Sequence, residues 1–148
     1  MLMNYRRNLP LLLLSVRETV RAHFQPTFRD NDITEQQWRI LRALYESPGQ
    51  SVVEIADSCC IMRPSIVGII ARMVHLDLIE RERSETDKRR SHVHLTPKGR
   101  ALVEKLLPVF DRIYRHIEDK VGKTCLDGIY AALDDFAESM QKVEVFEK

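Results

Sequence analysis

Apolar residues recur every three or four positions in six segments of the chain, which is the spacing that places them on one face of a helix. The predicted helices cover about residues 8–29, 34–46, 51–59, 63–76 and 97–121, and a last helix starts near residue 123. Pro26 should kink or end the first of them, because proline removes a backbone donor. Thr34 and Gln37 form a capping box that marks the start of the second helix. Ser51 and Glu54 repeat this pattern before the third.

Between residues 78 and 99 the apolar period changes to two. Val93 and Leu95 alternate there with His92 and His94, which predicts a β-hairpin. Its tip is long and charged, and holds Asp87, Lys88, Arg89 and Arg90. Cationic side chains on a short ribbon are suited to entering a nucleic-acid groove, and a neighbouring carboxylate such as Asp87 could hold an arginine extended. A solvated loop whose charges serve solubility is the alternative interpretation.

The predicted fold class is therefore mainly α with a small β-hairpin. A helix, a short turn, a second helix and a basic hairpin in this order make a winged helix-turn-helix. We expect a single domain of 148 residues, with the winged-helix lobe at about 33–98 and dimerisation helices at about 1–30 and 98–148. These outer helices carry more apolar surface than the lobe can cover, which favours a two-fold homodimer.

The net charge of +1 at pH 7 is distributed unevenly along the chain. Met62–Arg100 holds nine Lys and Arg against five Asp and Glu, a net charge of +4. Met1–Ile61 is neutral, and Ala101–Lys148 carries −3. The middle segment is therefore the part expected to meet phosphates. The longest apolar run, Leu11–Leu14, is far too short to span a bilayer, so we expect a cytoplasmic protein without a membrane partner.

The fourth predicted helix supplies the clearest candidates for contact with DNA. Its expected buried stripe consists of Ile66, Ile69, Ile70 and Met73. Gly68 costs about 1 kcal/mol relative to alanine in a helix interior, which a close approach of DNA or packing on the third helix would offset. The candidate DNA-binding residues are Arg63, Pro64, Ser65, Val67, Gly68 and Arg72 of this helix, with Asp87, Lys88, Arg89 and Arg90 of the hairpin tip.

The pattern Asp87-x-Arg89 followed by Val93-x-Leu95-Thr96-x-x-Gly99 resembles the wing signature of the MarR family of bacterial transcription regulators. The resemblance covers essentially the whole chain. Within that family the chain is similar to the HpaR group, regulators of homoprotocatechuate and related aromatic breakdown; the segments that carry this similarity are 13–18, 33–40 and 60–65. One departure is Asp77, where most members have a glycine that closes the recognition helix.

The resemblance implies a homodimer bound to double-stranded DNA at a pseudo-palindromic operator, with Arg89 inserted into the minor groove and no cofactor. It also implies a repressor that a small aromatic carboxylate releases, the ligand lying between the dimerisation helices and the DNA-binding lobe. Candidate ligand-binding residues are Arg17, Arg21, Trp38, Arg39 and Arg42. The alternative is that Trp38 is a core residue and the arginines are surface groups.

Other functions find less support in the residues. Redox sensing would use Cys59 or Cys60, but the sensing thiols of relatives lie near the start of the first helix, where this chain has none. Metal sensing would rest on His92 and His94 without a third ligand nearby in sequence. No catalytic motif is apparent, so we expect no enzyme. A protein-docking module would not need the basic tip together with Arg63.

Overall fold

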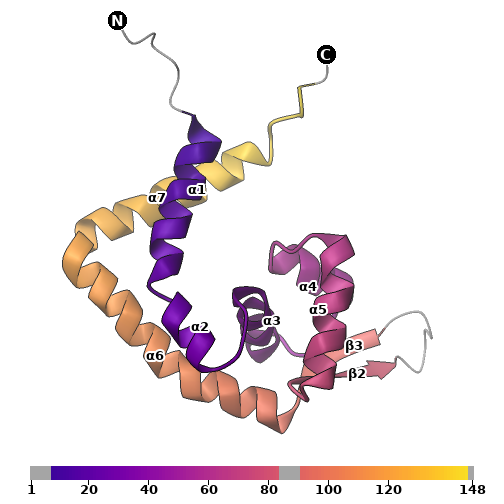
Figure 1. Cartoon of the computed structure of the whole chain (residues 1–148). Coiled ribbons are helices and arrows are strands. Elements are labelled where there is room, and N and C mark those ends of the chain that lie inside the picture. Colours follow the sequence, from indigo (N-terminus) through magenta and orange to yellow (C-terminus); the bar gives the residue numbers. More distant parts are fainter. Residues whose placement is uncertain (1–7, 84–90, 147–148) are drawn as a thin grey trace, which may run out of the picture. The chain divides into compact units, whose positions relative to one another are not determined.

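The computed structural model describes residues 8–83 and 91–146, and Figure 1 shows the course of the chain. The helices are α1 (Leu9–Ala22), α2 (Gln25–Asp30), α3 (Glu35–Glu46), α4 (Val52–Ser58), α5 (Arg63–His75), α6 (Pro97–Val121) and α7 (Lys123–Met140). The strands are β1 (Gln50–Ser51), β2 (Ile79–Arg83) and β3 (Ser91–Leu95). The predicted fold class, mainly helical with a small sheet, is confirmed. The chain divides into two compact units, Met1–Val109 and Phe110–Lys148.

The first predicted helix is in fact two helices, so its expected extent of 8–29 was wrong. The α1 helix ends at Ala22, and α2 begins at Gln25 after two intervening residues, with Pro26 in its first turn. The break therefore precedes the proline, because a helix tolerates proline in its first turn, where no donor is needed. Phe24 and Phe28, at the break and in α2, are buried, whereas α1 buries none of its own residues.

Both predicted capping boxes are present and fix the starts of α3 and α4. The Thr34 hydroxyl accepts from the Gln37 backbone N–H at 3.1 Å, and the Gln37 side chain accepts from the Thr34 N–H at 2.9 Å. The Ser51 and Glu54 pair makes the same two bonds at 3.3 and 2.7 Å. Each box satisfies two backbone donors that a helix start leaves open.

The core of the first unit lies where α3, α4 and α5 meet the sheet. Its fully buried side chains include Ile40, Leu41 and Leu44 of α3, Ile55 of α4, Ile70 and Met73 of α5, and Val93 of β3. Of the predicted α5 stripe, Ile66, Ile70 and Met73 are buried, while Ile69 is partly exposed. The α5 helix thus packs one apolar face inward, and within the described part of the chain its opposite face is exposed.

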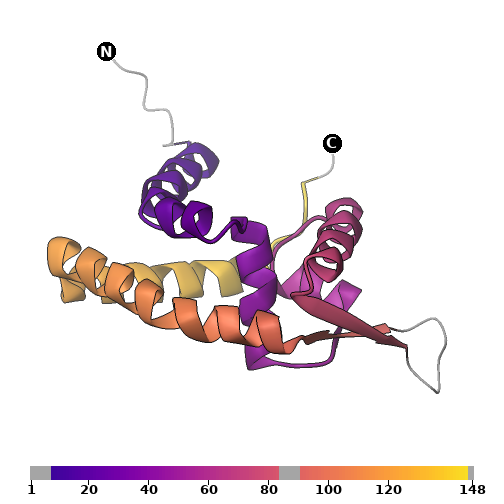
Figure 2. The same cartoon turned by 60° about the horizontal axis from the view of Figure 1, so that its bottom comes forward.

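The sheet has three antiparallel strands in the order β1-β3-β2. Strands β2 and β3 pair from Ile79 with Leu95 to Arg83 with Ser91, which confirms the predicted hairpin, and Figure 2 shows this ribbon projecting beyond the helices of its unit. The third strand, β1, was not predicted, because two residues are too few to show a period. The charged tip of the hairpin lies outside the described residues.

One threonine ties the end of α5, the hairpin and the start of α6 together. The Thr96 hydroxyl donates to the Asp77 carbonyl at 2.7 Å and accepts from the Gly99 N–H at 3.0 Å, and the Thr96 N–H donates to the Leu78 carbonyl at 3.2 Å. A Cβ atom at Gly99 would clash with that same Leu78 carbonyl oxygen. The Thr96-x-x-Gly99 part of the wing signature therefore has a structural cause: a capping hydroxyl and a backbone contact too close for any side chain.

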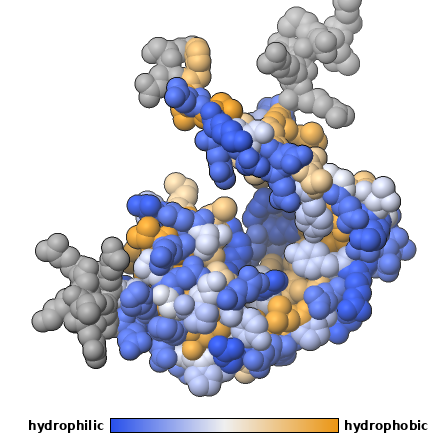
Figure 3. Space-filling model, turned by 180° about the vertical axis from the view of Figure 1, so that it is seen from behind, coloured by the Kyte–Doolittle hydropathy of each residue, from blue (hydrophilic) through white to orange (hydrophobic). Residues whose placement is uncertain are grey.

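Apolar side chains are exposed on both α1 and α7. On α1 they include Leu11, Leu14 and Val16; on α7 they are Ile129, Tyr130, Leu133, Phe136 and Met140. On the face that Figure 3 presents, hydrophobic side chains, in orange, are exposed at several places among hydrophilic ones. Among the described residues, no helix is both long enough and apolar enough to cross a bilayer.

Candidate DNA-binding and ligand-binding sites

The exposed face of α5 brings the helical DNA-binding candidates together. Arg63, Pro64, Ser65, Val67, Gly68 and Arg72 are all exposed. Val67 leaves 61% of its surface in solvent, and a Cβ at Gly68 would meet no atom of the described residues within 4 Å. The interpretation that Gly68 serves packing on α4 is therefore wrong. This face carries an arginine near each end and small or apolar residues between them, so the helix can lie close to the floor of a DNA groove.

The two α5 arginines are available to an outside anion. The Arg63 guanidinium lies 3.6 Å from an Asp57 carboxylate oxygen, and both side chains are about two-thirds exposed. Such a surface pair contributes little, so Arg63 can leave it for a phosphate at small cost. The predicted wing residues Asp87, Lys88, Arg89 and Arg90 lie outside the described residues.

The hairpin histidines are held by other groups. A ring nitrogen of His92 lies 2.8 Å from the Gly49 carbonyl oxygen, and a ring nitrogen of His94 lies 3.6 Å from a Glu82 carboxylate oxygen. Within residues 8–83 and 91–146 no three His, Cys, Asp or Glu side chains gather closely enough to hold a metal ion. The metal-sensing alternative gains no support from this part of the chain.

A pocket of about 520 Å³ opens between α1, α2 and α3. It is lined by Arg17, Glu18, Arg21, Gln25, Phe28, Arg29, Ile33, Thr34, Glu35, Gln36 and Arg39. Three of the predicted ligand residues, Arg17, Arg21 and Arg39, thus lie in one cavity, and this volume suits a small organic molecule. Phe28 and Ile33 give it an apolar wall, while the arginines give it positive charge.

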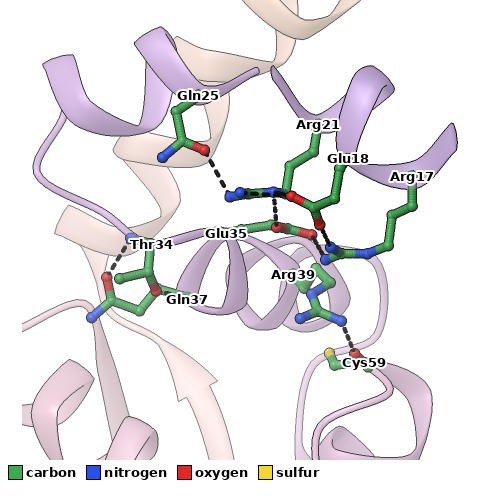
Figure 4. A network of polar contacts seen from close by, with 9 residues as sticks. All are labelled: Arg17, Glu18, Arg21, Gln25, Thr34, Glu35, Gln37, Arg39 and Cys59. Carbon is green, nitrogen blue, oxygen red and sulfur yellow. Dashed lines mark hydrogen bonds and ion pairs between the residues drawn. The ribbon is translucent and has the colours of Figure 1, made fainter. Parts of the chain in front are cut away.

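Two carboxylates in the pocket neutralise two of its arginines, as Figure 4 shows. Glu18 lies 2.6 Å from Arg17 and 2.9 Å from Arg21, and Glu35 lies 2.7 Å from Arg17 and 3.8 Å from Arg21. The hydrogen bond and charge of Arg21, with a smaller contribution from Arg17, lower the pKa of the Glu18 carboxyl. Sequence reasoning missed both glutamates. The spacing of three between Glu18 and Arg21 was a signal for one of them.

Arg39 is held differently from Arg17 and Arg21. Its Nη1 donates to the backbone carbonyl of Cys59 at 2.7 Å, and its Nε is buried without an acceptor among the described residues. Figure 4 shows this side chain extending from α3 to the end of α4.

The other two predicted ligand residues do not line this pocket. Trp38 is 7% exposed and belongs to the core, in agreement with the alternative interpretation of this residue. Arg42 forms an ion pair with Glu46 one turn later on α3, at 2.7 Å.

The described cysteines are free thiols in different surroundings. Cys59 is buried and Cys60 and Cys125 are exposed. Burial raises the pKa of the Cys59 thiol, which disfavours the reactive thiolate. This side chain therefore has the properties of a core residue rather than of an oxidant sensor.

Comparisons with known sequences and structures all identify regulators of one family. The sequence model of the MarR family matches residues 33–91. The homoprotocatechuate degradative operon repressor of Escherichia coli is 34% identical over 129 residues, which make up 87% of this chain and 87% of that protein. The structure of NadR in complex with 4-hydroxyphenylacetate superposes with a TM-score of 0.83 at 29% identity, covering 93% of this chain and 100% of that one. For CouR bound to a 23-mer DNA duplex, the TM-score is 0.78 at 27% identity, with 85% and 89% covered.

Proposed function

This chain belongs to the MarR family of DNA-binding transcriptional regulators and is not an enzyme, and we propose that it is a repressor of aromatic-compound catabolism that an aromatic acid releases from its operator. The observation that carries the proposal is the coexistence of two sites in one compact unit. One is the exposed, basic face of α5, and the other is the cationic pocket between α1, α2 and α3.

On the DNA side, α5 is the recognition helix and the β2–β3 hairpin is the wing. Arg63 and Arg72 contact bases or phosphates, and Val67 and Gly68 lie against base edges in the major groove. Arg89 at the wing tip enters the minor groove. The relative CouR, bound to a DNA duplex, supports this arrangement.

On the ligand side, the pocket takes a small aromatic carboxylate. Phe28 and Ile33 offer apolar surface to a ring, and the arginines offer donors to a carboxylate. The relative NadR binds 4-hydroxyphenylacetate, and the E. coli relative is named for homoprotocatechuate breakdown, which supports hydroxylated phenylacetates as the class to test. The ligand lowers DNA affinity by binding more tightly to a conformation that fits the operator poorly.

A fluorescence-anisotropy titration on the intergenic DNA upstream of the gene tests the proposal. We expect specific binding that weakens steeply between 50 and 200 mM salt, by about 10³-fold or more if six or more phosphates are contacted. One acid in a panel of hydroxylated phenylacetates and cinnamates should then release the DNA.

Two variants locate the interface. Arg63→Ala should weaken binding to the specific DNA, whereas Arg112→Ala, an exposed arginine of α6, serves as the charge-matched control and should leave it unchanged. Specific binding that no acid relieves would contradict the effector class. Absence of specific binding would contradict the proposed operator.

A further inference from the structure

The Arg39 side chain joins the ligand pocket to the turn that precedes the recognition helix. Arg39 is one of the residues that line the pocket, and its Nη1 donates to the carbonyl of Cys59, the C-cap residue of α4. Three residues separate Cys59 from the first residue of α5, Arg63. A change at Arg39 therefore reaches the recognition helix through a short stretch of chain.

Among the described residues, Arg39 is the pocket arginine that lies near no carboxylate, since Arg29, the fourth arginine of the lining, lies 3.9 Å from an Asp30 carboxylate oxygen. Arg17 and Arg21 are both paired with Glu18 and Glu35, so an incoming carboxylate must compete with two resident carboxylates there. Among the described residues, Arg39 has a backbone carbonyl as its acceptor, and its Nε is buried without one. A buried donor without an acceptor costs free energy. A ligand carboxylate that accepts hydrogen bonds from more of the Arg39 guanidinium nitrogens would therefore bind this side chain more favourably than the Cys59 carbonyl does alone.

The turn that Arg39 holds is itself under conformational strain. Cys60 has φ +50°, in the left-handed region that non-glycine residues rarely adopt. Its N–H donates to the Asp57 carbonyl at 3.3 Å, and the Ile61 N–H donates to the Ala56 carbonyl at 2.9 Å. The Arg39 bond adds a tertiary contact to this turn. Loss of that contact would ease rearrangement of the turn, and with it a shift of α5.

We propose that Arg39 is the positioning residue that couples the pocket to DNA binding: a bound carboxylate draws its guanidinium away from the Cys59 carbonyl, and the released turn changes the placement of α5. This inference rests on the proposed function, since it takes the effector to be an aromatic acid. It differs from a pure anchoring role, in which Arg39 would set the affinity for the ligand without affecting what the ligand does once bound.

The Cys59 thiol reports on the turn directly. Cys59 is buried, and replacing the other two cysteines in a Cys60→Ser/Cys125→Ser protein leaves it as the single thiol. Its rate of labelling by a small maleimide measures how often the turn opens. With saturating 4-hydroxyphenylacetate, or whichever acid of the panel releases DNA, we expect labelling to rise by about fivefold or more, in line with typical allosteric coupling. In the same background Arg39→Met should raise the rate without ligand, and ligand should add nothing further.

Arg112→Met is the matched control, because it removes the same charge at an exposed position that belongs neither to the pocket lining nor to the turn. It should leave the ligand-free labelling rate unchanged. The anisotropy titration supplies the second readout: DNA binding by Arg39→Met should no longer respond to ligand at concentrations that saturate it.

Two results would overturn the coupling role. One is release of DNA from the Cys59-only protein with no change in labelling, and the other is full release of DNA from Arg39→Met at saturating ligand. The first remains decisive even where Arg39→Met does not fold. If no acid releases DNA, the proposed effector class is wrong, and the coupling role is tested by Arg39→Met without ligand. Equal Cys59 labelling rates and equal DNA affinities of Arg39→Met and the parent protein would then refute the coupling role.

Discussion

Among the described residues, three that are not glycine adopt a left-handed conformation at the end of a helix. Asp32, Cys60 and Asp77 have φ of +52°, +50° and +57°, and they follow α2, α4 and α5. At each end the next residue donates its N–H five residues back, as in a Schellman motif. That next residue is Ile33, Ile61 or Leu78, each buried, so burial of an apolar side chain holds the turn in place of glycine.

Asp77 is the position where most family members have glycine, and its conformation explains that preference. Asp77→Gly should raise the free energy of unfolding by up to about 1 kcal/mol, because glycine adopts positive φ without a Cβ penalty. Asp77→Ala should lower it, since alanine tolerates this region less well than aspartate. Urea denaturation of the three proteins gives the comparison. Equal stability of the aspartate and glycine forms would mean that the turn is not strained.

The Glu18 carboxylate predicts a pH dependence of stability. Arg21, and to a lesser extent Arg17, lower its pKa below the ordinary value of 4.5, so its ion pairs stabilise the folded state above that value. The contribution should fade as the pH falls through the lowered pKa. We therefore expect Glu18→Gln to be less stable than the parent at pH 7, with the gap in melting temperature closing below pH 4.5. A gap that widens on acidification would contradict the pairing.

Among the elements, α5 shows a conflict between stability and function at Gly68. Gly68→Ala should raise the free energy of unfolding by about 1 kcal/mol, because a helix-interior glycine is unfavourable and its Cβ would meet open space in the described structure. The same change should weaken operator binding if DNA approaches this face closely. Melting curves and the anisotropy titration measure the two effects on one protein.

Gly99→Ala is the contrasting variant for that experiment. A Cβ there would clash with the Leu78 carbonyl, so this substitution should cost about 1–3 kcal/mol of stability, the usual range for overpacking. If the Gly68→Ala protein is more stable and binds DNA as tightly as the parent, Gly68 does not lie in the DNA interface.

Helix starts that are stabilised by side chains close to them in sequence could be predicted. The Thr34 and Ser51 capping boxes, and Thr96 before Pro97, define helix starts with side chains close in sequence to the groups they cap. The features that could not be predicted depend on tertiary contacts. The β1 strand exists because Gln50 pairs with Val93, and the break between α1 and α2 accompanies the burial of Phe24 and Phe28.

The candidate pocket follows the same rule. Arg17 and Arg21 could be predicted to share a helix face from their spacing of four, whereas Arg39 was a candidate only through the resemblance to the family; all three line one cavity. The pairing of Glu35 with Arg17 could not be predicted, because it joins residues 18 positions apart and depends on how α1 approaches α3. The contact from Arg39 to Cys59 likewise connects α3 with the end of α4.

For the whole molecule, the apolar face of α7 predicts its oligomeric state. Ile129, Leu133, Phe136 and Met140 recur at spacings of three and four, and each leaves 40–47% of its surface exposed in the single chain. We propose that a second copy covers this face, since two-fold homodimers are the commonest assemblies and an operator with two half-sites requires two recognition helices.

A charge on that face should therefore separate the two copies. Phe136→Glu is expected to convert the dimer to a monomer in light scattering, because burying an unpaired carboxylate in an apolar interface is strongly unfavourable. Ala131→Glu introduces the same side chain on the opposite side of α7 and should leave the dimer intact. DNA affinity should fall with the first variant alone, since a monomer engages one half-site. A Phe136→Glu protein that remains dimeric would place the interface elsewhere, and a monomer that binds the operator as tightly as the parent would show that one recognition helix is sufficient.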